Sequence, residues 1–263
     1  MVLDPAKSRQ TQILAQLEQL GSVRVEQLAE VHGVSVVTIR KDLSELEARG
    51  LLTRTHGGAI FVTPSRLNPS FYEKIGLQKP EKTAIARLAA TRVREGDSLI
   101  LDAGSTVLVL AQHLKTYFKQ LFIVTNSLAV ALELADSSFE VMLTGGQVRQ
   151  HSQALLGNAS VQMLETYHVD KVFLGTTGVS VEHGYTTPNP LERQTKRAML
   201  QAAKQRFVLC DASKLGVATL SSFARLEEIT ELITAGVVDD IFRQQLEGRG
   251  VKWSLAKSGD SVS

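Results

Sequence analysis

Residues 35–43 read SVVTIRKDL, and this stretch combines a helix cap with a helix that has two chemically different faces. The hydroxyl of Ser35 can cap the helix that follows it. Ile39, Leu43 and Leu46 recur at i, i+4 and i+7 and form one apolar stripe. The opposite side carries hydroxyls, a small apolar group and cations, as a helix in the DNA major groove requires. The residues expected to face DNA are Ser35, Val37, Thr38, Arg40, Lys41 and Ser44.

The segments on either side of this helix predict a winged helix-turn-helix. Upstream, an amphipathic helix ends at Gly21, and a short helix follows at about residues 25–31. A tight turn at Gly33 comes next, so we place the helix-turn-helix motif at about residues 23–42. Downstream, residues 49–59 contain two short extended runs around a basic, glycine-rich tip, which predicts a β-wing that reaches phosphates or the minor groove. The wing residues expected at DNA are Arg54, His56, Gly57 and Gly58.

Charge alone does not identify this module as a DNA-binding domain. Residues 1–62 contain seven basic and seven acidic side chains, so a small helical domain with merely solvated arginines is an alternative. DNA binding would then depend on where a few cations lie, and non-specific affinity would be modest and salt-sensitive. Asp42 is unusual in a helix that binds DNA. We expect it to point partly inward and to orient Arg40 or a backbone donor.

The whole chain has 263 residues, 43% of them hydrophobic and 21% charged, with a formal net charge of +2. This length suits two domains of ordinary globular composition. No apolar run has transmembrane length and no signal peptide is recognisable, so we expect a cytoplasmic protein without membrane contact. The single cysteine, Cys210, lies in an apolar run and is expected to be a buried strand residue. No histidines have metal-ligand spacing, and we expect neither a metal nor a cofactor.

Changes in composition along the chain divide it into parts. We expect a DNA-binding domain over residues 6–61, a linker over 62–79 that contains two prolines, an effector domain over 80–255 and a disordered tail over 256–263. From residue 81 on, helical stretches alternate with short apolar runs, which predicts an α/β domain with a mostly parallel sheet. Strands are expected at 98–101, 121–124, 140–143, 171–174, 206–210 and 231–233. Helices are expected at 81–94, 105–114, 128–135, 161–167 and 192–204.

Five of these strands are followed by small, polar or glycine-rich loops. The carboxyl edge of a parallel sheet is where α/β proteins bind ligands. Residues 104–106 open a helix and are expected to hold a phosphate on free backbone N–H groups. Arg149 and Lys214 could supply the counter-charge, and four other polar side chains could bind sugar hydroxyls. The expected effector residues are Asp102, Gly104, Ser105, Thr106, Asn126, Gly145, Gly146, Arg149, Gly175, Glu192, Lys196, Asp211 and Lys214. For Glu192 and Lys196, the alternative is an i,i+4 ion pair on a helix surface.

Residues 9–59 resemble the winged helix-turn-helix of DeoR-type bacterial transcription regulators. The matching positions are Arg9, Ile13, Leu17, Ser35, residues 38–43, Gly50 and residues 56–59. The family often has a second arginine where this chain has Lys41, so the resemblance supports a phosphate contact there more than base readout.

Residues from about 80 to 253 resemble the effector domain of the same family. The matching positions are residues 81–82, 85–86, 102–106, 125–126, 145–146 and 211–214, with Gly157, Gly175, Gly178, Glu192 and Lys196. The resemblance implies a fold similar to ribose-5-phosphate isomerase and a site for phosphorylated sugars. This chain departs from the family at Lys74, where arginine is common. The resemblance implies an interdomain contact at this position.

Two functions remain in view. The first is a repressor of a sugar-metabolism operon that a phosphorylated sugar releases from its operator, working as a homo-oligomer, either a dimer or a tetramer. The second is a sugar-phosphate isomerase or deaminase fused to a DNA-binding module, since such chemistry needs a carboxylate base and often a lysine. The candidate groups for it are Asp102, Asp211, Glu192, Lys196 and Lys214.

Overall fold

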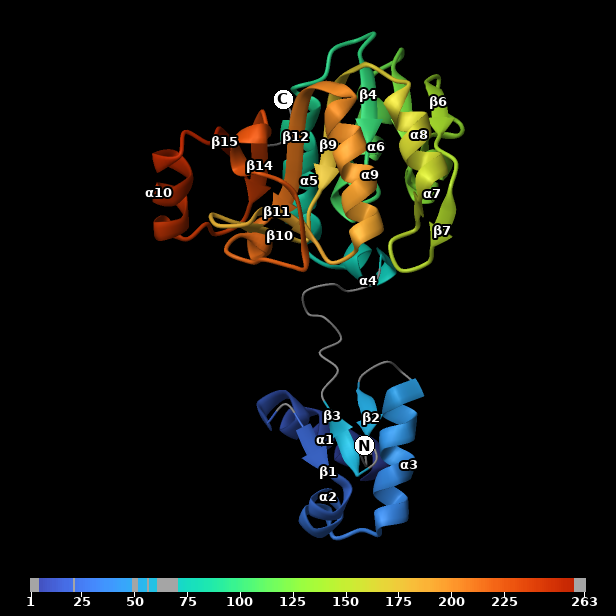
Figure 1. The fold of residues 1–263 in the computed structure, drawn as a ribbon, viewed down its shortest axis with the longest axis vertical. Helices are drawn as coiled ribbons and strands as arrows, with labels where there is room; N and C mark the ends of the chain where they lie inside the picture. The colour runs from blue at the N-terminus through green and yellow to red at the C-terminus, as the bar shows by residue number, and fades with distance from the viewer. Residues whose placement is uncertain (1–4, 21, 49–51, 56, 61–70, 258–263) are drawn as a thin grey trace. The chain divides into compact units, whose positions relative to one another are not determined.

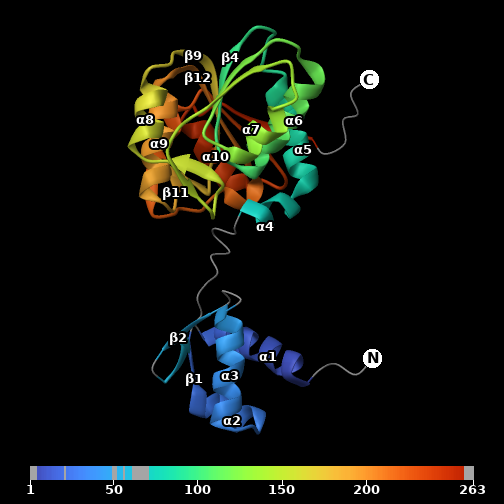
Figure 2. The same cartoon turned by 90° about the vertical axis from the view of Figure 1, so that its right-hand side faces the viewer.

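The computed structural model describes residues 5–20, 22–48, 52–55, 57–60 and 71–257. The chain divides into two compact units, Met1–Pro69 and Ser70–Ser263. Each unit is considered by itself, and Figures 1 and 2 show their elements. None of the described helices is long and apolar enough to cross a membrane.

The first unit is the expected winged helix-turn-helix. Its elements are α1 (Pro5–Leu20), β1 (Ser22–Arg24), α2 (Val25–His32), α3 (Val36–Ala48), β2 (Thr53–Thr55) and β3 (Gly58–Ile60). The core takes Ile13 and Leu17 from α1 and Ile39, Leu43 and Leu46 from α3, all with no exposed surface. The apolar stripes seen in the sequence therefore face one another.

The wing is a three-stranded antiparallel sheet in the order β1-β3-β2. Strand β1 was not expected, because it has only three residues between two helices. Gly58 pairs with Arg24 on that strand, and a Cβ at Gly58 would lie 1.9 Å from the carbonyl oxygen of Val23. This position therefore requires glycine for close approach of two backbones.

The second unit is built on a seven-stranded sheet in the order β15-β14-β12-β9-β4-β5-β6, in which every neighbouring pair is parallel. Its strands are β4 (Ser98–Leu101), β5 (Phe122–Thr125), β6 (Glu140–Leu143), β9 (Val169–Gly175), β12 (Ala203–Asp211), β14 (Glu231–Ala235) and β15 (Trp253–Ala256). The sequence predicted six of these seven strands. Cys210 lies buried in β12, and burial raises the pKa of its thiol.

Helices cover both faces of this sheet (Figures 1 and 2). One core contains Leu99, Leu101 and Phe173 and is covered by α5 (Lys79–Ala90), α6 (Ser105–Tyr117) and α7 (Leu128–Leu134). The other core contains Ile100 and Val172 and is covered by α8 (Asn158–Glu165), α9 (Pro190–Gln201) and α10 (Asp240–Gly248). Successive strand residues enter opposite cores, as the period of a strand requires.

Short elements that the sequence did not predict complete the carboxyl side of the sheet. A hairpin joins β7 (Gln147–Arg149) to β8 (Ala154–Leu156), and a small antiparallel sheet has the order β10-β11-β13. The strands of that sheet are β10 (Gly178–Ser180), β11 (Gly184–Thr187) and β13 (Ser221–Ala224), with the 3-10 turns η1 (Ala212–Lys214) and η2 (Leu226–Glu228) nearby in the chain.

The boundaries of the expected linker, 62–79, differ from the structure. Helix α4 (Phe71–Gly76) and the start of α5 lie inside that range and belong to the second unit. Phe71 is buried, and its amide donates a hydrogen bond to the carbonyl oxygen of His151 at 2.9 Å. The prolines that indicated a linker lie upstream of this anchor. Residue 256 ends β15, whereas residues 258–263 of the expected tail lie outside the described residues.

Candidate DNA-binding surface and effector site

Helix α3 begins as predicted, with Ser35 as its cap. The Ser35 Oγ accepts a hydrogen bond from the Thr38 amide at 3.2 Å and lies 2.9 Å from the Thr38 hydroxyl. Val37 is 74% exposed, and Arg40 and Lys41 are exposed as well. The structure therefore leaves Val37, Arg40 and Lys41 on the open side of α3, whereas the hydroxyls of Ser35 and Thr38 bond each other.

Ser44 joins the wing to α3. Its hydroxyl donates to the Arg40 carbonyl at 2.9 Å and accepts from Arg54 Nη1 at 2.7 Å. The Arg54 amide also donates to Glu47 Oε1 at 2.9 Å. These contacts hold β2 against the C-terminal half of α3, so Arg54 has a structural role beside any contact with DNA.

The wing glycines differ in their surroundings. Gly57 is exposed, and its carbonyl accepts a hydrogen bond from the Val25 amide at 3.0 Å. Gly58 is buried against the backbone of β1 and offers little surface to a ligand. His56, expected at the wing tip, lies outside the described residues.

Asp42 points inward as expected, but the partners found for its carboxylate are Arg9 and Gln10 and not Arg40. The carboxylate is buried and accepts from Arg9 Nε at 2.6 Å, from Arg9 Nη2 at 3.2 Å and from Gln10 Nε2 at 3.3 Å. Both partners lie on α1, toward which Asp42 points. Arg40 lies on the exposed side of α3. The acid therefore fixes α1 to α3 and keeps its negative charge away from the open side of α3.

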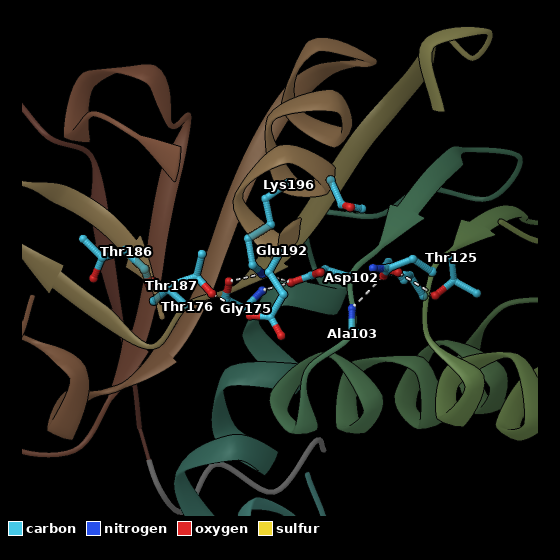
Figure 3. Close-up of polar contacts among 12 residues, drawn as sticks. Asp102, Ala103, Thr125, Gly175, Thr176, Thr186, Thr187, Glu192 and Lys196 are labelled. Carbon is cyan, nitrogen blue, oxygen red and sulfur yellow. Dashed lines mark hydrogen bonds and ion pairs between the residues drawn. The ribbon is translucent and has the colours of Figure 1, made fainter. Parts of the chain in front are cut away.

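In the second unit, the buried side chains of Asp102 and Lys196 meet the half-buried Gly175 at the carboxyl end of the sheet (Figure 3). Lys196 Nζ donates to Asp102 Oδ2 and, at 2.9 Å, to the Gly175 carbonyl. The Gly175 amide donates to Asp102 Oδ2 at 3.0 Å. Burial raises the pKa of Asp102 despite the attraction of Lys196. The cluster joins β4, β9 and α9.

Asn126 holds two loops in place rather than presenting free polar atoms. Its Oδ1 accepts from the Ala103 amide at 3.0 Å, and its Nδ2 donates to the Leu155 carbonyl at 3.4 Å. The loop between β4 and α6 is thereby tied to the β7–β8 hairpin. This arrangement positions Gly104, the N-cap residue of α6. No side-chain hydrogen bond caps this helix.

Glu192 is the second carboxylate of the site. It accepts from the Thr187 hydroxyl at 2.6 Å and from Arg149 Nη1 at 3.0 Å. Burial opposes its ionisation, but the Thr187 hydrogen bond and the charges of Lys196 and Arg149 hold the pKa of Glu192 below its ordinary value. The surface ion pair between Glu192 and Lys196 does not form, because Lys196 turns inward to Asp102 and Glu192 turns to Arg149.

A small pocket opens among these groups, lined by Asp102, Ala103, Asn126, Ala154, Leu156, Glu192 and Lys196. Ser105 and Thr106, in the first turn of α6, are buried and are not among the residues that line this pocket. Gly145 and Gly146 are exposed and lead into the hairpin. Gly146 has a φ of +127°, and a Cβ there would lie 2.5 Å from the Leu156 carbonyl, so this residue shapes the hairpin.

Asp211 ends β12 and precedes η1, and Lys214 is the last residue of η1. The Asp211 carboxylate caps this turn by accepting from the Ser213 amide at 3.1 Å and from the Ser213 hydroxyl. The Asp211 carboxylate therefore shapes the turn that follows β12. Lys214 is half-buried and is close enough to Lys74 and Lys82 to lower the pKa of each.

Lys74, on α4, belongs to the site although the sequence associated it only with an interdomain contact. Burial lowers its pKa to about 8, with Glu192 raising it and Lys214, Lys196 and Arg149 lowering it further. The structure thus brings Lys214, Lys196, Arg149 and Glu192 close to Lys74. Sequence reasoning missed Lys74 because α4 lies in the expected linker, and only the arginine common there in the family hinted at a role.

Comparison with known proteins agrees with this two-part organisation. The family model described as a DeoR-like helix-turn-helix domain matches residues 9–65, and that described as a DeoR C terminal sensor domain matches residues 77–235. The chain is 39% identical over 223 residues to the Bacillus subtilis protein named "Uncharacterized HTH-type transcriptional regulator FruR", covering 84% of this chain and 88% of that protein. It is 36% identical over 247 residues to the Bacillus subtilis "HTH-type transcriptional repressor GlcR", covering 94% and 95%.

A third relative is the "Putative aga operon transcriptional repressor" of Escherichia coli O157:H7, 34% identical over 258 residues and covering 97% of this chain and 92% of that protein. Among solved structures, ribose 5-phosphate isomerase A from Neisseria gonorrhoeae has a TM-score of 0.40 at 17% identity, covering 52% and 53% of the two chains. A likeness this distant carries no argument about activity. The relatives are transcriptional regulators, which does not support the alternative of a fused isomerase or deaminase. The chain belongs to the DeoR family of helix-turn-helix transcriptional regulators.

Proposed function

We propose that this regulator represses a sugar-metabolism operon in the cytoplasm and that a phosphorylated sugar, bound at the carboxyl edge of the seven-stranded sheet, releases it from operator DNA. The names of two relatives, a GlcR repressor and a putative aga operon repressor, support repression as the outcome. The observation that carries the effector assignment is the approach of Lys196, Lys214, Arg149 and Glu192 to Lys74 at this edge of the sheet.

The charge of this site suits a phosphate group. Lys196 is paired with Asp102 and Arg149 with Glu192, and both cations lie near Lys74, as does Lys214. A phosphate monoester carries about −1.5 to −2 at neutral pH, so a site rich in cations suits it. The uncapped first turn of α6 supplies backbone donors for the same group.

The DNA contact would depend on few groups, because the module is formally neutral. Val37 and Arg40 lie on the open side of α3 and are our candidates for base contacts. Lys41 is a candidate for phosphate contact, since an ammonium lacks the bidentate fork of arginine. Two copies of α3 reading two half-sites would require a homo-oligomer, a dimer or a tetramer. Light scattering on the purified protein gives its size.

The DNA assignment is tested by a mobility-shift assay on DNA from upstream of the gene, with a scrambled sequence of equal length. At physiological salt we expect the upstream fragment to bind at least about a thousandfold more tightly. Equal binding to both fragments would contradict the assignment.

The effector assignment is tested by thermal unfolding with ribose 5-phosphate, fructose 1-phosphate, glucose 6-phosphate and glucosamine 6-phosphate, each against its unphosphorylated sugar. The only tryptophan, Trp253, lies on β15 and reports unfolding of the second unit. A ligand at a hundred times its dissociation constant stabilises by about 2.7 kcal/mol. Lys214→Ala should reduce this stabilisation, whereas Lys119→Ala, a matched change at an exposed lysine beyond the C-terminal end of α6, should not. Equal responses to sugars with and without phosphate would contradict the assignment.

A further inference from the structure

Helix α4 is the first described element after residue 60, so along the chain it is the part of the second unit nearest to the DNA-binding unit. It is also in contact with the proposed effector site. We infer that α4 is the element that couples ligand binding to DNA binding. The bound phosphorylated sugar fixes α4 onto the rest of the second unit, and this fixation changes the chain's affinity for operator DNA. The inference rests on the proposed function and adds the route by which the ligand acts.

The two ends of α4 are held by contacts that a ligand need not touch. At the start, Phe71 is 4% exposed, and its amide donates to the His151 carbonyl at 2.9 Å. At the end, the buried ammonium of Lys82 donates to the Leu77 carbonyl at 2.6 Å and to the Lys74 carbonyl. A cation at the last carbonyls of a helix is a favourable partner for them.

The middle of α4 carries the ligand-sensitive group. Lys74 is repelled by Lys214, Lys196 and Arg149 and attracted by Glu192. Without an anion, burial and these three cations oppose a charged Lys74 in the docked position of α4, whereas Glu192 favours it. A bound phosphate would turn three repulsive neighbours into shared partners of one anion, so the docked position would bind the ligand more tightly than an undocked one. A difference in affinity between two states is what any ligand-driven change requires.

The β7–β8 hairpin offers a second path between ligand and helix. His151 lies in the turn that follows Arg149, and Arg149 bonds Glu192 at 3.0 Å. The carbonyl that receives the Phe71 amide is therefore two residues from a group of the site. Ligand contacts that steady Arg149 would steady this acceptor as well.

Helix α4 is suited to two states because it is short. It has six residues, and helices shorter than about 12–15 residues are marginal in water without tertiary contacts. Its order thus depends on tertiary contacts, among them those of Phe71 and Lys82 and the packing on α6. Ordering or release of a segment is a common form of switching.

Hydrogen exchange on the full chain tests the inference in the wild-type protein, with glucose 6-phosphate, fructose 1-phosphate and ribose 5-phosphate as probes at matched ionic strength. We expect the probe that stabilises the second unit to slow exchange of the amides of residues 71–77 at least about tenfold. Protection at residues 103–107 and 147–156 with unchanged exchange at 71–77 would overturn the coupling role of α4 and leave the proposed function standing. A lack of protection by any probe would overturn both.

A variant pair gives an independent test. In wild type we expect saturating probe to change operator affinity by about 5- to 150-fold, the usual range of allosteric coupling. Phe71→Ala should bind the probe more weakly, yet at saturation the change in operator affinity should fall below about twofold. Leu77→Ala, an aliphatic truncation at a side chain that is 52% exposed, should keep the wild-type change. Wild-type coupling in saturated Phe71→Ala would overturn the inference, and should that variant not fold, the exchange experiment decides.

Discussion

Replacing Lys196 by methionine should strongly destabilise the second unit, because the change leaves Asp102 buried without its cation. Lys196 and Asp102 are 6% and 2% exposed. Removing one partner of a buried pair costs about 3–5 kcal/mol. Asp102 keeps the Gly175 amide as a donor at 3.0 Å, so we expect the lower end, about 3 kcal/mol. For a unit of this size, that loss lowers the unfolding midpoint by about 6–12 °C.

The loss should also depend on pH with a definite sign. Burial already raises the pKa of Asp102, and removing the Lys196 charge raises it further. A carboxyl group whose pKa is raised on folding contributes stability at low pH that is lost as pH rises through the folded pKa. The deficit of Lys196→Met should therefore be largest at about pH 8 and shrink toward about pH 5.

Trp253 fluorescence during thermal unfolding of the ligand-free protein measures the effect on the second unit alone. The double variant Asp102→Asn with Lys196→Met is the matched control, because it removes both charges at similar volume. We expect it to recover more than half of the lost stability. A deficit below about 1 kcal/mol that does not change with pH would refute the reasoning, since it would mean that the pair is solvated.

Three further predictions concern the two sites. Arg40→Ala should weaken operator binding by at least about 1 kcal/mol without changing the thermal transition of the second unit, and an unchanged dissociation constant would remove Arg40 from the interface. Asp42→Ala should destabilise the first unit by about 2 kcal/mol. This is less than the loss expected on breaking a fully buried ion pair, because the partner, Arg9, is partly exposed. Hydrogen exchange of residues 9–17 and 36–47 measures the loss. Binding of a phosphorylated sugar should weaken as pH rises through about 8, because Lys74 loses its proton there. The affinity of Lys74→Gln for the sugar should depend less on pH. Equal pH profiles of the two proteins, measured by calorimetry, would exclude contact with Lys74.

The sequence was sufficient for the main sheet and for helix α3. Runs of apolar residues bounded by turn formers predicted β4 and β6 with their observed ends, and the stripe of α3 predicted which face is buried. The three-residue strands of the hairpin and the wing were missed or only outlined, because so few residues carry no periodic signal. Helix α4 was missed because nearby prolines indicated a linker. In the structure the buried ring of Phe71 fixes this helix to the second unit.

The site was predictable in its location and less so in its pairings. Loops at one sheet edge indicated which residues would gather, since parallel strands bring their carboxyl ends together. Which carboxylate takes which cation was decided by tertiary packing. Lys196 bonds Asp102, which is 94 residues upstream, and Asp42 bonds Arg9 on another helix. Such partners are set by the fold and not by spacing along one helix.

The central claim is that an anion site in the second unit controls the affinity of the first unit for DNA. The most direct measurement is the dissociation constant for a labelled upstream fragment, by fluorescence anisotropy, without ligand and with a phosphorylated sugar or its unphosphorylated counterpart at equal ionic strength. The account predicts that a phosphorylated sugar raises this constant at least about fivefold, whereas the unphosphorylated sugar leaves it unchanged. A constant that no phosphorylated sugar alters, in a protein that binds one of them, would contradict the account.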